Sequence, residues 1–304
     1  MQLPLRGIVT PLATPLAQSK QAEPVLDAQA LDGLIDHVIT GGVHGIFLLG
    51  TTGESSSLSR EMRQEIVHRA CAKVQVRVPV LVSISDNAIS ESLRMAETAV
   101  EAGADALVLA APCYFQNSQD DLFRYVREIA ARVTLPLFLY NIPHLTKNSF
   151  EPETVRLASE LPGVVGLKDS TGDLGYLERT VELMRGRPGF SILTGPEEIL
   201  VDCMRRGAIG GVSGGSNLNP ELFAALYNSV MAGDTARAEE LQQKVNRIST
   251  ALYRVGFPGS SYLRGLKAAL EVAGLCRAHP APPYFPLSAE EQAQLEQNYR
   301  ALEG

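Results

Sequence analysis

The strongest constraint on the fold is the alternation of short apolar segments with amphipathic stretches along the whole chain. Eight apolar segments recur, and nearly every position in them is apolar. They are RGIVT (6–10), GIFLL (45–49), VPVLVSI (78–84), DALVLAA (105–111), LPLFLY (135–140), VVGLK (164–168), FSILT (190–194) and IGGVS (209–213). A strand with one wet face would alternate apolar and polar residues, so these segments indicate parallel strands that are covered on both faces.

Helical patterns fill the intervals between the segments. Core-to-core separations of roughly 20 to 40 residues leave room for a crossover helix each time. Residues 89–104 and 120–133 each carry apolar side chains at helical spacing, and each stretch ends just before an apolar segment. Eight strand–helix units of this kind predict a closed (β/α)8 TIM barrel.

The pattern changes after the eighth segment, where helices follow one another with no strand between them. The predicted helices span residues 219–234, 235–255 and 260–275, and the first of them completes the barrel. A proline cluster at 279–286 then breaks the chain, and Ser288 with Glu291 has the spacing of a capping box that begins a last helix. We therefore predict a catalytic barrel domain over residues 1–232 and a C-terminal helical region over 233–304.

Composition excludes several classes of function. The net charge is −7 and no basic run exceeds Arg205-Arg206, which argues against binding to nucleic acid. No segment approaches the roughly 18 apolar residues of a membrane span, and the first residues lack the pattern of a targeting signal. Four cysteines without a CxxC pair indicate reduced thiols, and no histidine or cysteine spacing indicates a metal site. We expect a cytoplasmic protein without a metal or organic cofactor.

Lys168 is the most informative residue at a strand end. Catalytic groups of such barrels lie at the carboxyl ends of the strands, and Lys168 is the one lysine of six that closes a predicted strand. Burial favours the neutral amine, which is the form that attacks a carbonyl to give a Schiff base. The alternative is a surface lysine whose ammonium extends past the barrel rim into water.

Tyr140 closes the preceding strand, so its side chain should lie beside that of Lys168. A phenol can transfer a proton to and from an imine intermediate when a neighbouring hydroxyl relays it onward. Alternatively, Tyr140 is a rim residue that packs beside Pro143.

Two loops at strand ends could bind an anion. GTTGES (50–55) combines glycines, whose backbone N–H groups can turn toward a ligand, with the hydroxyls of Thr51 and Thr52. GGVSGG (210–215) follows the eighth strand, where barrels of this type often bind phosphate. Both compositions also occur in ordinary tight turns, so the loops alone leave the choice open.

Four motifs together resemble a known family. GTTGES after the second strand, PCYF (112–115) after the fourth, YNIP (140–143) at the fifth and GLKDSTGD (166–173) at the sixth occur in this order. The chain is similar in these motifs to the dihydrodipicolinate synthase and N-acetylneuraminate lyase family of class I pyruvate-type lyases. The resemblance extends over nearly the whole chain.

The resemblance implies roles for four catalytic residues. Lys168 would form the Schiff base with the 2-oxo group of pyruvate or of a longer 2-oxo acid. Tyr140 would be the proton-transfer phenol and Thr51 the relay hydroxyl. Tyr114 would complete the relay from a neighbouring subunit, which implies a homodimer at least and, by the habit of the family, a homotetramer.

The resemblance also implies substrate contacts. The substrate carboxylate would bind at Gly50, Thr51 and Thr52, with backbone groups of Val212 and Ser213 assisting. Dihydrodipicolinate synthases carry an arginine at the position of Leu145, where it pairs with the carboxylate of the second substrate. An apolar side chain cannot form that ion pair, so the departure argues against their activity.

Other positions resemble sialic-acid lyases and 2-keto-3-deoxy sugar-acid aldolases. Gly195 is followed by the acidic pair Glu197 and Glu198, which in that group contacts sugar hydroxyls, and Ser170 holds another sugar-facing position. Gly214 departs from the lyases, which carry a serine there.

We therefore expect an aldolase or lyase that cleaves or forms a bond between pyruvate and an aldehyde, with a 2-keto-3-deoxy sugar acid as substrate. The alternatives are 4-hydroxy-tetrahydrodipicolinate synthase, a sugar-acid dehydratase or N-acetylneuraminate lyase, and a non-catalytic module that binds 2-oxo acids.

Overall fold

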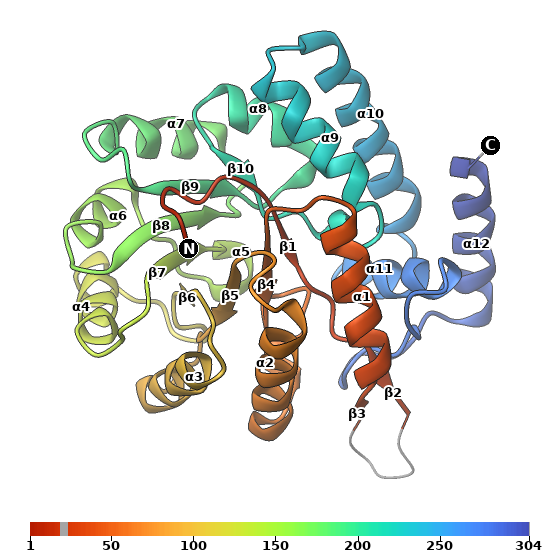
Figure 1. Ribbon diagram of the computed structural model, residues 1–304, viewed down its shortest axis with the longest axis horizontal. Helices are drawn as coiled ribbons and strands as arrows, with labels where there is room; N and C mark the ends of the chain where they lie inside the picture. The colour runs from red at the N-terminus through yellow and green to blue at the C-terminus, as the bar shows by residue number, and fades with distance from the viewer. Residues whose placement is uncertain (19–23, 304) are drawn as a thin grey trace.

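The chain folds into a closed barrel of parallel strands, as the computed structural model of residues 1–18 and 24–303 shows (Figure 1). Around the barrel each strand pairs with its neighbours in the chain, and the first pairs with the last. The strands are β1 (Gly7–Pro11), β4 (Gly45–Leu48), β5 (Val80–Ser83), β6 (Ala106–Ala110), β7 (Leu137–Asn141), β8 (Val164–Asp169), β9 (Ser191–Thr194) and β10 (Gly210–Gly211). Each overlaps one predicted segment, so the predicted TIM barrel is confirmed.

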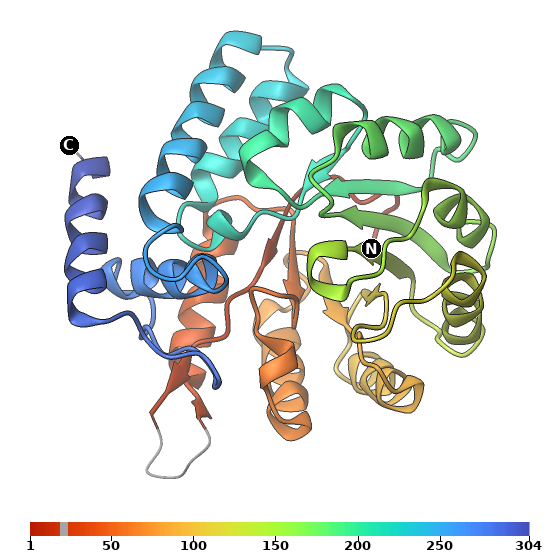
Figure 2. The ribbon, with the colours of Figure 1, turned by 180° about the vertical axis from the view of Figure 1, so that it is seen from behind.

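Helices surround the barrel on its outer face (Figures 1 and 2). They are α1 (Ala28–Thr40), α2 (Arg60–Val74), α3 (Ile89–Glu101), α4 (Gln119–Ala130), α6 (Pro152–Ala158), α7 (Leu174–Leu183), α8 (Leu200–Arg205) and α9 (Pro220–Met231), with the short α5 (Pro143–Thr146) after β7. The helices predicted over 89–104 and 120–133 are present as α3 and α4. The chain leaves α3 near Gly103, which adopts a positive φ of 80° that most other residues avoid.

A small antiparallel hairpin, which the sequence patterns did not predict, precedes α1. Its strands are β2 (Leu16–Ala17) and β3 (Val25–Leu26). Each of these two-residue strands lies between a proline and a polar residue, so no longer apolar segment marks it.

Three C-terminal helices lie together at one side of the barrel, with the last one outermost (Figures 1 and 2). They are α10 (Thr235–Leu252), α11 (Ser261–Val272) and α12 (Ala289–Glu303). The capping box that begins α12 is confirmed: the Glu291 N–H donates to Ser288 Oγ over 3.2 Å, and the Ser288 N–H donates to the Glu291 carboxylate over 2.8 Å.

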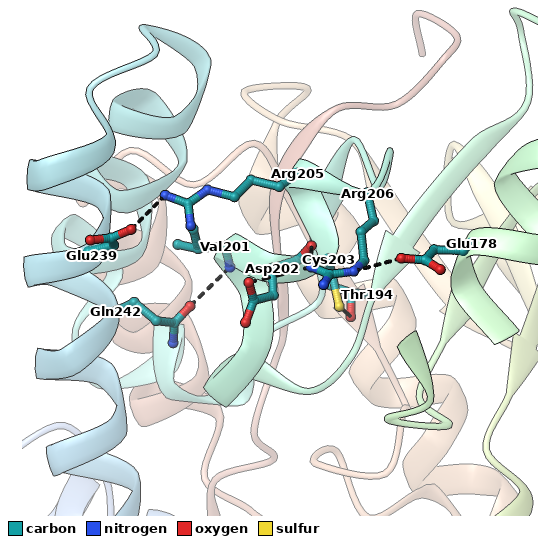
Figure 3. A network of polar contacts seen from close by, with 9 residues as sticks. All are labelled: Glu178, Thr194, Val201, Asp202, Cys203, Arg205, Arg206, Glu239 and Gln242. Atoms are coloured by element: carbon teal, nitrogen blue, oxygen red, sulfur yellow. Dashed lines mark hydrogen bonds and ion pairs between the residues drawn. The ribbon is translucent and has the colours of Figure 1, made fainter. Parts of the chain in front are cut away.

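Polar contacts tie α10 to the barrel helix α8 (Figure 3). Arg205 pairs with Glu239 over 3.0 Å, and the Val201 N–H donates to Gln242 Oε1 over 3.0 Å. The boundary expected after residue 232 lies at the end of α9, and these contacts cross it. The division into two domains stays a prediction.

Apolar side chains fill the barrel interior. The innermost cluster includes Val9, Phe47, Leu81, Val108, Phe138 and Leu193, all of them buried. A second, larger cluster joins the outer faces of the strands to the helices and continues into α11 and α12 through Leu266 and Leu295. The interior is therefore a packed core rather than a channel. In the described ranges, no helix has the length and apolar character that crossing a membrane requires.

Candidate active site

Lys168 and Tyr140 are direct neighbours at the carboxyl end of the barrel. Strands β7 and β8 pair in parallel with Tyr140 opposite Lys168 and Asn141 opposite Asp169. This register places an amine and a phenol in adjacent sectors of one barrel mouth.

The Lys168 amine is held inside that mouth. Only 6% of the residue is exposed. Its Nζ lies 3.9 Å from the centroid of the Tyr140 ring and 5.0 Å from that of Phe47. Aromatic faces attract the charged form of an amine and exclude water around it. The side chain therefore does not extend past the rim into solvent.

Tyr140 connects this amine to the loop after β4. Its hydroxyl lies 3.3 Å from Thr51 Oγ1, within hydrogen-bonding distance. The ring packs edge-on against Phe47, with centroids 6.2 Å apart. Three of the four predicted catalytic residues, Lys168, Tyr140 and Thr51, thus form one contiguous arrangement.

Tyr114, the fourth predicted catalytic residue, lies at the surface of this chain. It is 79% exposed and packs edge-on against Phe115, which is 74% exposed, with centroids 5.0 Å apart. Its φ of 89° is a strained value for a residue with a side chain. The loop after β6 therefore presents an aromatic pair outward, and a single chain does not bring Tyr114 to Thr51.

The GTTGES loop is fixed by close packing. A side chain at Gly50 would place its Cβ 2.5 Å from the Phe47 ring, so only glycine fits there. Thr52 is buried, and its Oγ1 lies 3.0 Å from the hydroxyl of Tyr262 on α11. Tyr262 lies on a C-terminal helix rather than at a strand end, so the pattern of strand ends does not predict its role.

A buried ion pair, which the pattern of strand ends does not predict either, anchors the same loop. Glu54 and Lys267 form a salt bridge with both side chains 1% exposed. Lys267 also donates to the His279 carbonyl over 2.6 Å, and the Ala281 N–H donates to Glu54 over 2.7 Å. Burial raises the pKa of Glu54 and lowers that of Lys267, and their mutual attraction opposes both shifts. The sequence signal for this pair is Lys267, a lysine on the apolar side of the helix α11.

Val212 and Ser213 lie at the end of β10. The Val212 N–H already donates to the Thr194 carbonyl over 2.7 Å, so it is not free to bind a carboxylate. Ser213 Oγ is buried and has no hydrogen-bond partner within the described part of the chain. Of the two residues, only Ser213 offers an unused polar group.

The acidic pair after β9 is engaged by the protein itself. Glu197 is 5% exposed and accepts a hydrogen bond from the Gly215 N–H over 2.7 Å, and burial raises its pKa to about 8. Glu198 is exposed and accepts from Ser249 Oγ on α10 over 2.6 Å. Both carboxylates therefore already have partners within the chain, and their predicted contacts with sugar hydroxyls stay a prediction.

Ser170 and Gly195 lie against one another at the ends of β8 and β9. A Cβ on Gly195 would lie 1.9 Å from Ser170 Oγ, and the Gly195 N–H donates to the Asp169 carbonyl over 2.7 Å. Glycine at 195 therefore leaves the space that the Ser170 side chain fills.

A pocket of about 860 Å³ opens at this barrel mouth. Tyr140, Thr51 and Tyr262 contribute to its wall, as do the polar residues Ser83, Ser85, Asn87 and His144. Leu145 also lines it and is 51% exposed. The volume exceeds the needs of a three-carbon acid, so a longer substrate fits. Within residues 1–18 and 24–303, no three or more His, Cys, Asp or Glu side chains are grouped so that they could hold a metal ion.

Comparison with known sequences gives a family match over almost the whole chain. The profile of the dihydrodipicolinate synthetase family matches residues 4–302. A 4-hydroxy-tetrahydrodipicolinate synthase of Methanopyrus kandleri is 31% identical over 93% of this chain and 91% of its own length. The probable 2-dehydro-3-deoxy-D-pentonate aldolase YjhH of Escherichia coli is 32% identical over 92% of each chain.

Solved structures are similar to this chain over almost its whole length. A dihydrodipicolinate synthase of Bacteroides thetaiotaomicron superposes with a TM-score of 0.94 at 44% identity, covering 99% of this chain and 100% of that one. YagE of Escherichia coli, solved in complex with pyruvate, gives a TM-score of 0.91 at 31% identity and covers 99% of both chains. These relatives differ in the reactions that their names state.

Proposed function

Because this chain belongs to the dihydrodipicolinate synthetase family and is a class I, Schiff-base-forming lyase, we propose that it cleaves a 2-keto-3-deoxy sugar acid into pyruvate and an aldehyde. The single observation that carries the proposal is the cross-strand pair of Lys168 and Tyr140, with the phenol 3.3 Å from Thr51. This arrangement supplies a nucleophile beside a proton-transfer group.

In the proposed reaction, the Lys168 amine attacks the 2-oxo carbon and water leaves as the imine forms. The protonated imine accepts the electron pair of the C3–C4 bond as that bond breaks, which gives an enamine. Tyr140, coupled to Thr51, takes the proton of the C4 hydroxyl, so that C4 leaves as an aldehyde. Protonation of the enamine and hydrolysis then release pyruvate and restore the free amine.

The GTTGES loop supplies the proposed carboxylate site. Thr52 and the neighbouring backbone N–H groups of Gly50 and Thr51 can donate to an anion, and Ser213 Oγ has no partner elsewhere in the described structure. No step of this mechanism requires a metal or organic cofactor.

Polar side chains of the pocket wall support a hydroxylated substrate, and Arg63 is the one arginine among the described residues that lines the pocket. Leu145 lines the pocket and cannot pair with a distal carboxylate, whereas Ser83, Ser85, Asn87 and His144 can bond to hydroxyl groups. The second candidate is 4-hydroxy-tetrahydrodipicolinate synthase, which the 44% identical solved structure favours. In that case another residue would have to replace the cation missing at Leu145.

We further propose that the enzyme is a homodimer or homotetramer in which Tyr114 acts in the site of a neighbouring subunit. The exposed Tyr114–Phe115 pair supports this arrangement, since exposed aromatic side chains are enriched at protein interfaces. We retain, as a proposal, a barrel domain over 1–232 and a helical region over 233–304.

Borohydride reduction in the presence of pyruvate tests the chemistry. Mass measurement should locate a reduced pyruvyl adduct on Lys168, and Lys168→Ala should abolish it. Lys244→Ala, which changes an exposed lysine on α10, is the matched control and should trap as much adduct as the unmodified enzyme. Absence of an adduct on Lys168 would refute the proposal.

A substrate panel separates the two candidates. The sugar-acid aldolase should release pyruvate from 2-keto-3-deoxy sugar acids of five or six carbons. Faster condensation of pyruvate with an aldehyde that carries its own carboxylate would favour the synthase instead.

A further inference from the structure

We propose that Tyr262 is a positioning residue for Thr52, and that residue 214 is glycine because the Tyr262 hydroxyl occupies the space that a side chain there would need. The inference rests on the proposed function, in which Thr52 binds the substrate carboxylate. It assigns part of that site to the C-terminal helical region.

The contact between Tyr262 and Thr52 joins two distant parts of the chain. Tyr262 lies in the first turn of α11 and lines the pocket, and Thr52 belongs to the loop after β4. Their hydroxyl oxygens are 3.0 Å apart. A phenol is the stronger acid of the two, so the Tyr262 hydroxyl is the better donor and Thr52 Oγ1 the acceptor. The Thr52 proton is then left to point at a ligand.

The chemistry of Tyr262 fits a permanent donor. Burial, with the nearby Glu197 carboxyl, raises the pKa of this phenol. The hydroxyl therefore keeps its proton throughout the ordinary pH range. The Tyr262 hydroxyl can therefore donate to Thr52 at any ordinary pH.

The Tyr262 hydroxyl occupies space that is free because residue 214 is glycine. An ideal Cβ on Gly214 would lie 1.6 Å from Tyr262 Oη and 2.8 Å from Cζ. The backbone of Gly214 has no positive φ, so its conformation does not require glycine. The remaining reason for glycine at position 214 is the space that the Tyr262 side chain needs.

Contacts with other residues fix the position of the Tyr262 ring and of its helix, α11. The ring packs edge-on against Tyr253, with centroids 5.6 Å apart. Five residues further along α11, Lys267 forms the buried ion pair with Glu54, which lies in the same loop as Thr52. The helix thus holds the GTTGES loop at two points, and only the Tyr262 contact reaches the proposed carboxylate ligand.

Tyr262→Phe tests the proposal, because it removes the hydroxyl and keeps the ring. The pyruvate concentration for half-maximal borohydride trapping should rise about five- to tenfold, the effect of losing one hydrogen bond. The maximum amount of adduct should stay unchanged, since Lys168 and Tyr140 are intact. A general loss of structure would lower the maximum instead.

Tyr253→Phe is the matched control. It removes the hydroxyl of the other tyrosine in the same aromatic pair, and that hydroxyl has no partner among the residues the structure describes. Its trapping curve should match that of the unmodified enzyme. Gly214→Ala should raise the midpoint as well, because its Cβ would displace the Tyr262 side chain from Thr52.

The trapping experiments distinguish a failure of this inference from a failure of the proposed function. Trapping in the unmodified enzyme together with an unmoved midpoint in Tyr262→Phe would overturn this inference alone. If no adduct forms at all, the proposed chemistry fails. Stabilisation of Lys168→Ala against heat by pyruvate, compared with the Lys168→Ala/Tyr262→Phe variant, then still tests the carboxylate site. Equal stabilisation of the two would overturn the inference.

Discussion

At the scale of single residues, the site depends on polar groups that the fold buries at considerable cost. Lys168 lies over two aromatic rings, and the Glu54–Lys267 pair is almost fully enclosed. Burial of a charge is tolerable only with partners, and each of these groups has them. The backbone acceptor at His279 and the backbone donor at Ala281 complete the pair.

Removing one member of that pair should be strongly destabilising. We expect Lys267→Met to lower the free energy of unfolding by roughly 3–5 kcal/mol, because Glu54 is left buried and uncompensated. Urea unfolding measures the change. The double variant Glu54→Gln/Lys267→Met should recover part of the loss. Arg185→Met, which breaks the exposed pair with Glu182, should stay within about 0.5 kcal/mol of the unmodified protein.

Glu197 should give the stability a specific pH dependence. Its pKa rises from an ordinary value of 4.5 to about 8 on folding, so between these pH values the folded state keeps a proton that the unfolded state releases. Stability from this group is complete below pH 4.5 and is lost as pH rises toward 8, by up to about 1.4 kcal/mol per pH unit.

Glu197→Gln removes the titration and keeps an oxygen for the Gly215 N–H. The variant should therefore gain stability relative to the unmodified protein as pH rises from 5.5 to 7.5, as measured by urea unfolding at each pH. Glu198→Gln controls for the loss of a carboxylate and should run parallel to the unmodified protein. Parallel curves for Glu197→Gln as well would contradict the assignment.

At the scale of elements, the patterns of the sequence determine the barrel but not every contact between its parts. Uniformly apolar segments identified the eight strands, and the parallel register then placed Tyr140 beside Lys168. No longer apolar segment marks the two strands of the hairpin β2–β3. Tyr262 and Lys267 were missed because their roles depend on where α11 packs, and the amphipathic period of a helix does not specify its partner.

The capping box of α12 is a local feature that can be tested on its own. Ser288→Ala removes the oxygen that accepts the Glu291 N–H, and we expect a loss of about 1 kcal/mol. Hydrogen exchange should quicken at the first turn of α12 and leave the barrel strands unaffected. Gln297→Ala, on the exposed side of the same helix, is the control. Equal exchange in both variants would show that the cap is not stabilising.

At the scale of the whole molecule, the proposed site is incomplete in one chain. Lys168, Tyr140 and Thr51 assemble within the barrel, while Tyr114 lies at the surface beside Phe115. The C-terminal helices contribute Tyr262 from the other side. The proposed site thus draws on the barrel, the helical region and a second subunit, so that folding, packing and association would each be required for activity.

Mixing two inactive variants tests the contribution of the second subunit. Lys168→Ala lacks the nucleophile, and Tyr114→Phe lacks the end of the relay, so each alone should have little activity. If Tyr114 acts across a two-fold interface, a mixed dimer contains one complete site, with Lys168 from one subunit and Tyr114 from the other. Random exchange makes half of the dimers mixed, so about a quarter of the full activity should return. If Tyr114 acted within its own chain, mixing would restore nothing, because every site would lack one of the two groups.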